Sequence, residues 1–456
     1  MDRGNDVKIP KRILNTLLVS LAAGVVPRSG APYIAIGRGE EINALLGDIA
    51  YVKDGGAAVR FLIGRYGSGK SFLIQLIRGY ALDRDFLSAD CDLSPERRLS
   101  GGSGGGLATY RELIRNLASK ASPDGGALIS VLSRQYTAIS SELAKAGILN
   151  GAPTFKASLC RRVYETLSAL ESGVGGFDFA RVLYEYYAAL ADDDGVKRSA
   201  CLRWLRGEFS TKTEARHALG FPISTIIDDD NWYDYLKLWA ELSALLGYSG
   251  LIVFIDECVN LYKIPNRISR EANYEKLLAI FNDTLQGRAK HLGVVFGGTP
   301  QFLEDTRRGL FSYEALRSRL SDSRFTELGF RTLTSPVIRL RRLSDNELLA
   351  LLSRLSKLFA THHGIAELLT ENDVAAFLTA CLRRAGATEL ITPREMIRNF
   401  LSLLNVLREN GDASFASLLS RFSGVSPSED TNLPEAETPF GASRADSPTV
   451  IPEFDF

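Results

Sequence analysis

The chain has 456 residues, more than a single hydrophobic core usually supports, so we expect two or three structural units. Its 54 basic residues balance its 54 acidic residues, which excludes any argument from net charge for a nucleic-acid or membrane partner. The five cysteines show no C-x-x-C or Cys/His spacing, and this pattern predicts reduced, buried thiols rather than a metal site.

The N-terminal arm, residues 1–32, contains an apolar run over residues 13–26 that follows three basic residues, much as in a signal peptide. However, its large apolar residues recur at i, i+3, i+4 and i+7, and polar residues occupy the other side. This spacing predicts an amphipathic helix instead. We expect the helix to dock on the nucleotide-binding domain that the next segments indicate.

Residues 33–71 contain a predicted helix, a predicted strand and a phosphate-binding motif. An extended apolar piece is turned by Gly37 into a helix that runs to about residue 50, and residues 59–63 predict a strand. The next eight residues, GRYGSGKS, match the phosphate-loop pattern G-x-x-x-x-G-K-S. Glycines allow backbone N–H groups to close around a phosphate, and the helix that begins near Lys70 adds its positive end.

This loop predicts binding of ATP with Mg²⁺. Lys70 is expected to bridge the β- and γ-phosphates, and the Ser71 hydroxyl is expected to be a Mg²⁺ ligand. The residues expected to hold the nucleotide here are Gly64, Arg65, Tyr66, Gly67, Ser68, Gly69, Lys70, Ser71 and Phe72.

A second strand is predicted over residues 86–92, and a glycine-rich turn follows at residues 101–106. Residues 100–235 then show helical periodicity broken by Gly, Pro and Asn, which predicts a large helical insertion. It serves either as a scaffold or as a surface for a partner or DNA, and the sequence does not separate these alternatives.

Residues 251–257, LIVFIDE, predict a buried strand of a parallel sheet that ends in two carboxylates. Asp256 is placed to hold Mg²⁺ through water, and Glu257 to orient and deprotonate the attacking water. A solvated strand end is the alternative, but the phosphate loop upstream favours a Walker B motif and hydrolysis. We therefore expect an ATPase core in residues 33–99 and 236–335.

The sequence from residue 293 onwards predicts a strand at residues 293–300, a basic stretch, a last core strand at residues 337–340, and a small helical lid assigned to residues 336–424. The basic stretch, residues 307–342, has nine arginines and no lysine, which indicates either a solvated face or phosphate recognition. In the lid, residues 344–347 read as a capping box, and helices are expected to about residue 360, over 370–384 and over 393–409. The acidic tail, residues 425–456, is expected to be disordered, as a solubilising or a docking segment.

Together these segments resemble AAA+ ATPases, particularly the branch that contains origin-recognition initiators and STAND ATPases. The fold implied is an α/β P-loop core with a parallel sheet and a C-terminal helical lid. The resemblance implies that Gly37 and Arg38, in a G-R-x-x-E segment, pack beside the adenine. It implies that Thr299 is the sensor-1 residue.

The same resemblance implies roles for three arginines. Arg319 is the first candidate for an arginine finger that acts on a neighbouring subunit, and Arg317 is the second. Arg394 occupies the place of a sensor-2 arginine. An arginine finger supplied in trans implies a homo-oligomer.

Residues 8–424 also resemble the ATP-binding proteins of bacteriophage-exclusion (BREX) defence systems, a P-loop family often encoded beside a large helicase. The phosphate loop, residues 92–98 (DLSPERR), the Asp-Glu pair and residues 313–319 (YEALRSR) carry this resemblance. It implies a cytoplasmic ATPase of anti-phage defence that acts on DNA or on a DNA-bound partner such as a helicase, without membrane association. Two functions stay open: a motor or loader that turns over ATP, and a nucleotide-gated switch that recruits a partner.

Overall fold

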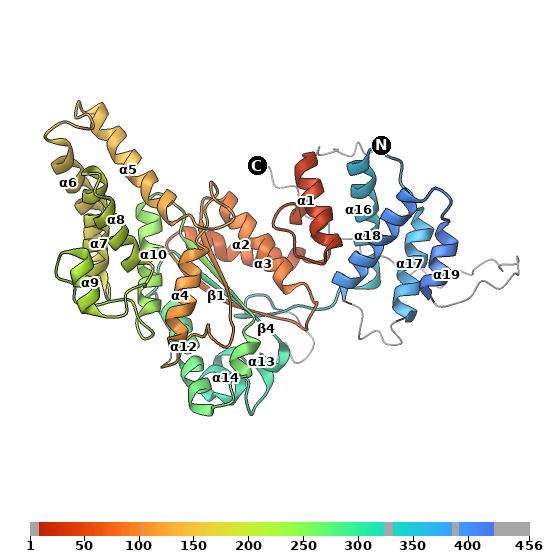
Figure 1. The fold of residues 1–456 in the computed structure, drawn as a ribbon. Helices are drawn as coiled ribbons and strands as arrows, with labels where there is room; N and C mark the ends of the chain where they lie inside the picture. The colour runs from red at the N-terminus through yellow and green to blue at the C-terminus, as the bar shows by residue number, and fades with distance from the viewer. Residues whose placement is uncertain (1–8, 103, 323–331, 385–391, 424–456) are drawn as a thin grey trace, which may run out of the picture. The chain divides into compact units, whose positions relative to one another are not determined.

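The computed structural model describes residues 9–102, 104–322, 332–384 and 392–423 (Figure 1). Within them the chain forms two compact units. We call the described residues of the ranges 1–43, 64–76 and 340–456 the helical unit, and those of the ranges 44–63 and 77–339 the sheet unit. The predicted disordered tail, residues 425–456, lies outside the described residues.

The sheet unit contains a five-stranded sheet in the order β2-β3-β4-β1-β5, in which every pairing is parallel. The central strands β3 and β4 are buried along their whole length, as expected for continuous apolar runs covered on both faces. The α/β class and the parallel sheet are therefore confirmed. The strands are β1 (Ala57–Ile63), β2 (Leu87–Asp92), β3 (Leu251–Asp256), β4 (Leu292–Gly298) and β5 (Val337–Arg339).

The strand register aligns the carboxyl ends of four strands. Asp92, the last residue of β2, pairs with Asp256, the last residue of β3. Ile63, which ends β1, pairs with Gly298, which ends β4. Residues that follow these strands therefore start from one edge of the sheet, the edge at which parallel α/β sheets bind ligands.

The long connection between β2 and β3 is helical, as predicted, and shares one hydrophobic core with the sheet. All three tryptophans lie there and are fully buried. Trp239 donates from Nε1 to the Tyr110 hydroxyl at 2.9 Å, and Tyr110 donates to the Leu205 carbonyl at 2.8 Å, so these buried polar atoms are satisfied. The helices are α4 (Gly105–Arg115), α5 (Leu128–Lys145), α6 (Phe155–Leu167), η2 (Ser168–Leu170), α7 (Gly176–Ala191), α8 (Gly195–Leu205), α9 (Lys212–Leu219) and α10 (Trp232–Leu245).

Four short helices and the longer α12 follow β3 and β4 in the described part of the sheet unit. They are α11 (Val259–Tyr262), α12 (Arg267–Leu285), α13 (Pro300–Glu304), η3 (Leu310–Ser312) and α14 (Glu314–Leu320). All five cysteines of the chain are buried and carry free thiols, as predicted. Burial raises the pKa of Cys91 to about 12, so this thiol is unreactive at neutral pH.

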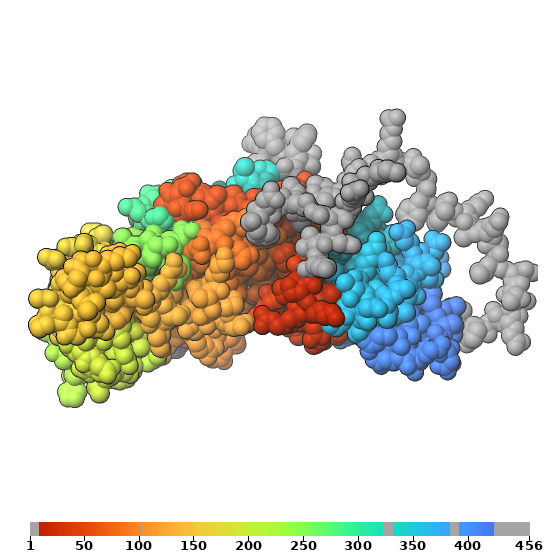
Figure 2. Space-filling model, turned by 90° about the horizontal axis from the view of Figure 1, so that it is seen from above, coloured from red at the N-terminus to blue at the C-terminus, as the bar shows by residue number. Residues whose placement is uncertain are grey.

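The helical unit has its own core, in which the N-terminal helix α1 (Lys11–Ala22) lies beside helices from the far end of the chain (Figure 1). In Figure 2 the red residues of the N-terminal segment adjoin the blue C-terminal residues directly. The predicted capping box at Ser344 opens α16, and the structure shows a second capping box, at Thr392, that opens α18. The C-terminal helices are α16 (Asp345–His363), α17 (Glu371–Arg384), α18 (Pro393–Glu409) and α19 (Phe415–Ser423).

Helix α1 is amphipathic, as predicted, and its buried leucines at 14, 17, 18 and 21 pack with α16 and α18, because that bundle offers a matching apolar face. One local expectation was wrong. The extended piece expected from residue 33 begins instead within the short 3-10 helix η1 (Ala31–Ile34), in which Pro32 occupies the first turn. Among the described residues, no helix has both the length and the apolar character needed to cross a bilayer.

The chain passes between the two units four times. It does so within α2 (Gly39–Lys53), between Ile63 and Gly64, within α3 (Lys70–Asp83) and between Arg339 and Leu340. The candidate phosphate loop, residues 64–71, therefore belongs to the helical unit, although the strand before it belongs to the sheet unit.

Candidate functional site

The loop from Gly64 to Ser71 makes a tight turn between β1 and α3. Gly67 and Gly69 adopt φ values of +76° and +90°, which glycine reaches without steric cost. The Ser68 amide donates to the Arg65 carbonyl at 3.1 Å and closes the turn. Lys70 donates from Nζ to the Gly64 carbonyl at 2.8 Å, so its ammonium lies over the start of the loop.

This geometry fits a phosphate group. The first amides of an α-helix have no acceptor within the helix, and α3 has no acidic residue in its first turn to compete with an anion. A Cβ added at Gly69 would meet no atom within 4 Å, so open space lies beside that backbone. The Ser68 hydroxyl is buried and has no hydrogen-bond partner among the described residues, as at a site that takes a polar ligand.

Asp256 and Glu257 stand at the carboxyl end of β3 in the sheet unit. Asp256 is only 8% exposed, and its Oδ1 accepts the Glu257 amide hydrogen at 2.8 Å. Glu257 is exposed and has φ +56°, in the left-handed region that costs a non-glycine residue about 1–2 kcal/mol. Backbone strain of this kind concentrates at functional sites, which supports a chemical role for Glu257.

A third carboxylate, missed in the sequence, lies beside this pair. Asp92 ends β2 and pairs in register with Asp256. Partial desolvation, followed by the charges of Asp256 and Glu257, raises the pKa of Asp92. The signal was present, because Asp92 also terminates a predicted strand, but only the strand order makes it a neighbour of β3.

Thr299 directly follows β4, the strand that lies between β3 and β1. It is the N-cap of α13, and its Oγ1 accepts the Phe302 amide hydrogen at 3.2 Å. A hydroxyl that accepts in this way still has its own hydrogen to donate. Thr299 is therefore held at the carboxyl edge of the sheet with its hydroxyl hydrogen available to donate.

The arginine-finger candidates Arg319 and Arg317 lie on α14 and are both exposed. Arg319 donates from Nε to Asn282 Oδ1 at 3.2 Å and from Nη1 to the Ala315 carbonyl at 2.7 Å. Arg317 forms a loose ion pair with Glu314, in which Nη1 lies 3.8 Å from Oε2. Part of the basic stretch, residues 323–331, lies outside the described residues.

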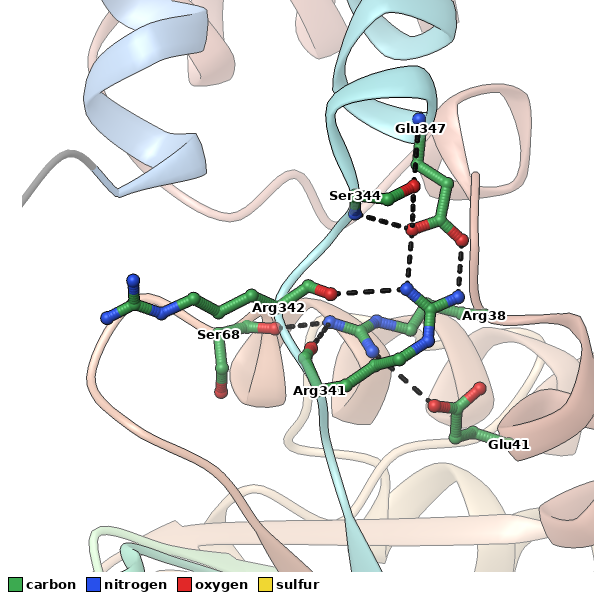
Figure 3. Close-up of polar contacts among 7 residues, drawn as sticks. All are labelled: Arg38, Glu41, Ser68, Arg341, Arg342, Ser344 and Glu347. Atoms are coloured by element: carbon green, nitrogen blue, oxygen red, sulfur yellow. Dashed lines mark hydrogen bonds and ion pairs between the residues drawn. The ribbon is translucent and has the colours of Figure 1, made fainter. Parts of the chain in front are cut away.

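In the helical unit, Arg38 of the segment expected beside the adenine contacts the phosphate loop through its guanidinium (Figure 3). Arg38 is 4% exposed and donates from Nη2 to the Ser68 carbonyl at 2.8 Å and to the Arg341 carbonyl at 2.7 Å. Gly37 has φ +73° and lies against Glu347, where a side chain would collide. Phe72, at the start of α3, packs against the core of the C-terminal helices.

The N-terminus of α18 also contacts the loop. Arg394, the sensor-2 candidate, places its guanidinium 6.0 Å from the centre of the Tyr66 ring. Tyr66 is 77% exposed, so this cation–π contact is worth about 0.5–1 kcal/mol. Thr392, the N-cap of α18, lies directly against Gly67, where an added Cβ would come within 2.5 Å of its Cγ2.

The contact between Gly67 and Thr392 yields a prediction for stability. Replacing Gly67 with Ala is expected to destabilise the protein both by backbone strain and by overpacking, the latter by about 1–3 kcal/mol. Gly220→Ala is the matched control, since Gly220 has φ +75° but nothing within 4 Å of an added Cβ. Urea unfolding of both variants measures the difference, and equal losses would show that Thr392 does not restrict position 67.

The family model of the BREX system ATP-binding protein BrxC/D matches residues 9–422. The chain belongs to this family. The resemblance inferred from the phosphate loop and the acidic pair is thereby confirmed, and the BrxC/D match covers all the candidate site residues of both units. Membership makes the protein an ATP-binding component of a BREX defence system. No curated protein matches the chain.

Proposed function

We propose that this BrxC/D-family protein is a Mg²⁺-dependent ATPase with an AAA+-type core, and that it couples ATP hydrolysis to remodelling or loading of a DNA or helicase complex. The observation that carries the proposal is the edge of the sheet. The phosphate loop continues from the end of β1, Thr299 follows β4, Asp256 ends β3 and Glu257 follows it, and these three strands are adjacent and parallel.

Each of these side chains has a chemical task in the proposal. Lys70 and the amides at the start of α3 bind the phosphates, while Ser71 and Asp256 hold Mg²⁺, directly and through water, respectively. Glu257, exposed and strained, accepts a proton from the attacking water. Thr299 donates its hydroxyl hydrogen towards the γ-phosphate or that water.

The remaining parts of the chain complete the proposed ATPase. We assign residues 33–99 and 236–335 to the ATPase core, residues 100–235 to an insertion for partner contacts, and residues 336–424 to a lid that follows the state of the loop. The contacts of Arg38, Thr392 and Arg394 with residues 66–68 support this lid. Exposed Arg319 on α14 supports a homo-oligomer in which it serves a neighbour's nucleotide.

The same contacts favour a second candidate, a nucleotide-gated switch with little turnover. Thr392 and Arg394 contact the phosphate loop directly, and Arg38 bridges Ser68 to the Arg341 carbonyl, so binding alone would alter the C-terminal helices without repeated hydrolysis. The two candidates differ in turnover. Steady-state ATPase rates, measured with and without duplex DNA, distinguish them, because a motor or loader hydrolyses continuously and responds to its substrate.

Replacing Glu257 with Gln tests hydrolysis directly. The variant is expected to bind ATP as the wild type does but to turn over about 10²–10⁴-fold more slowly, because the amide cannot take a proton from water. Gln has the same backbone strain as Glu, so stability should not change. Single-turnover hydrolysis and equilibrium binding measure the two effects; an unchanged rate would remove Glu257 from the chemistry and leave the switch as the better function.

A further inference from the structure

Arg38 joins two backbone segments that are distant in sequence (Figure 3). Its Nη2 carries two hydrogens, and the Ser68 and Arg341 carbonyls accept them at 2.8 and 2.7 Å. Ser68 belongs to the phosphate loop, whereas Arg341 belongs to the segment that leads into α16. One nitrogen therefore links the loop to the entry of the C-terminal helices.

The link is buried and electrically balanced. Arg38 is 4% exposed and its partner Glu41 only 1%, with Nη1 3.4 Å from Oε1 of Glu41. Burial lowers the pKa of Arg38, while the charge of Glu41 acts in the opposite direction. Removing one member of a buried pair leaves the other charge uncompensated, so separating Arg38 from Glu41 costs free energy.

The connection continues into the first turn of α16. The Arg341 side chain donates to both carboxylate oxygens of Glu347, with Nη1 2.6 Å from Oε2. These bonds lower the pKa of Glu347 to about 2, so its charge is maintained at neutral pH. Glu347 also closes the capping box with Ser344, and Gly37 packs against its carboxylate. The residue before Arg38 thus touches the same helix cap.

We propose that Arg38 is a positioning residue that holds the phosphate loop and the entry of α16 in one arrangement, so that phosphate bound in the loop is sensed by the C-terminal helices. This inference rests on the proposed ATP binding. It differs from the adenine-side role that the AAA+ resemblance implies for Arg38. Both hydrogens of Nη2 are given to backbone carbonyls, and the side chain presents almost no surface to a base.

A phosphate ligand that has no base distinguishes a positioning role of Arg38 from a role in contacting the adenine. In Arg38→Lys the charge opposite Glu41 is kept, but the planar fork that reaches two carbonyls is lost. We titrate the full chain calorimetrically with tripolyphosphate, ATP or GTP in the presence of Mg²⁺. The affinity for all three ligands is expected to fall by the same factor of about ten, equivalent to about 1.4 kcal/mol. Weaker binding of ATP together with unchanged binding of tripolyphosphate would show that Arg38 recognises the base, and it would overturn the proposal.

Arg60 provides the matched control. Like Arg38, it donates to two backbone carbonyls, of Leu333 and Ser335, and to a carboxylate, that of Asp48, but it lies in the sheet unit. Arg60→Lys is expected to leave all three affinities unchanged. If the wild type binds ATP and Arg38→Lys binds all three ligands equally well, the positioning role is wrong while the proposed function stands; if the wild type binds none of them, both are wrong.

Hydrogen exchange supplies a readout that general destabilisation would not change. At saturating ATP, the first turn of α16 is expected to gain protection in the wild type and in Arg60→Lys, but not in Arg38→Lys. Full protection in Arg38→Lys would overturn the proposal. Should Arg38→Lys fail to fold, the double variant Arg38→Gln, Glu41→Gln removes both buried charges together, and the same two results are expected from it.

Discussion

Lys70→Ala is expected to abolish detectable nucleotide binding. The Lys70 ammonium lies over the start of the phosphate loop, 2.8 Å from the Gly64 carbonyl. In the proposed function it faces the phosphates of the nucleotide. Two unit charges 4 Å apart near a protein surface attract by about 4 kcal/mol, which corresponds to a factor of about 10³ in Kd. Equilibrium titration with a fluorescent ATP analogue measures the loss.

Two comparisons make this result specific. Lys53→Ala removes an exposed lysine from the last turn of α2 and should not affect nucleotide affinity. The melting temperature of Lys70→Ala is measured in parallel, so that a loss of binding is separated from a loss of folding. Unchanged affinity in folded Lys70→Ala would refute the loop as the nucleotide site.

Arg319→Ala is expected to keep ATP affinity and to lose turnover. An arginine supplied to a neighbour's nucleotide stabilises charge on the transferring phosphoryl group, an effect of about 10³–10⁵ in rate in GTPases. Arg319 is exposed, and its known partners, Asn282 and the Ala315 carbonyl, are neutral, so their exchange for a phosphate is favourable. Steady-state hydrolysis at saturating ATP measures the loss.

Arg317→Ala is the matched control, since Arg317 lies on the same helix, is exposed and has a loose ion pair with Glu314. Its turnover should fall much less than that of Arg319→Ala. The reverse order would transfer the finger to Arg317, and full activity of both variants would remove α14 from the chemistry.

A mixing experiment tests whether Arg319 acts between subunits. Lys70→Ala and Arg319→Ala are each expected to be inactive, but mixed oligomers contain interfaces that pair an intact loop with an intact arginine. Some activity should therefore return on mixing. Absence of rescue in variants that demonstrably assemble together, or full wild-type activity in a dilute monomer, would contradict an arginine supplied in trans.

The sequence by itself determined the features that depend on neighbouring residues. The apolar run before Asp256 predicted β3, the glycines and Lys70 predicted the loop between β1 and α3, and the capping box at Ser344 predicted the start of α16. These signals are local, because a cap or a phosphate loop is made by residues within one or two turns of each other. The family followed from the same short segments.

Only the tertiary structure decided which distant segments meet. The leucines of α1 indicate an apolar face, but nothing in their spacing says that α16 and α18 cover it. The same holds for Asp92 beside Asp256, which follows from strand order, and for Arg38, whose acceptors lie 30 and 303 residues away. Periodicity reports that a face is buried or a charge must be paired, whereas the partner is selected by packing of the whole chain.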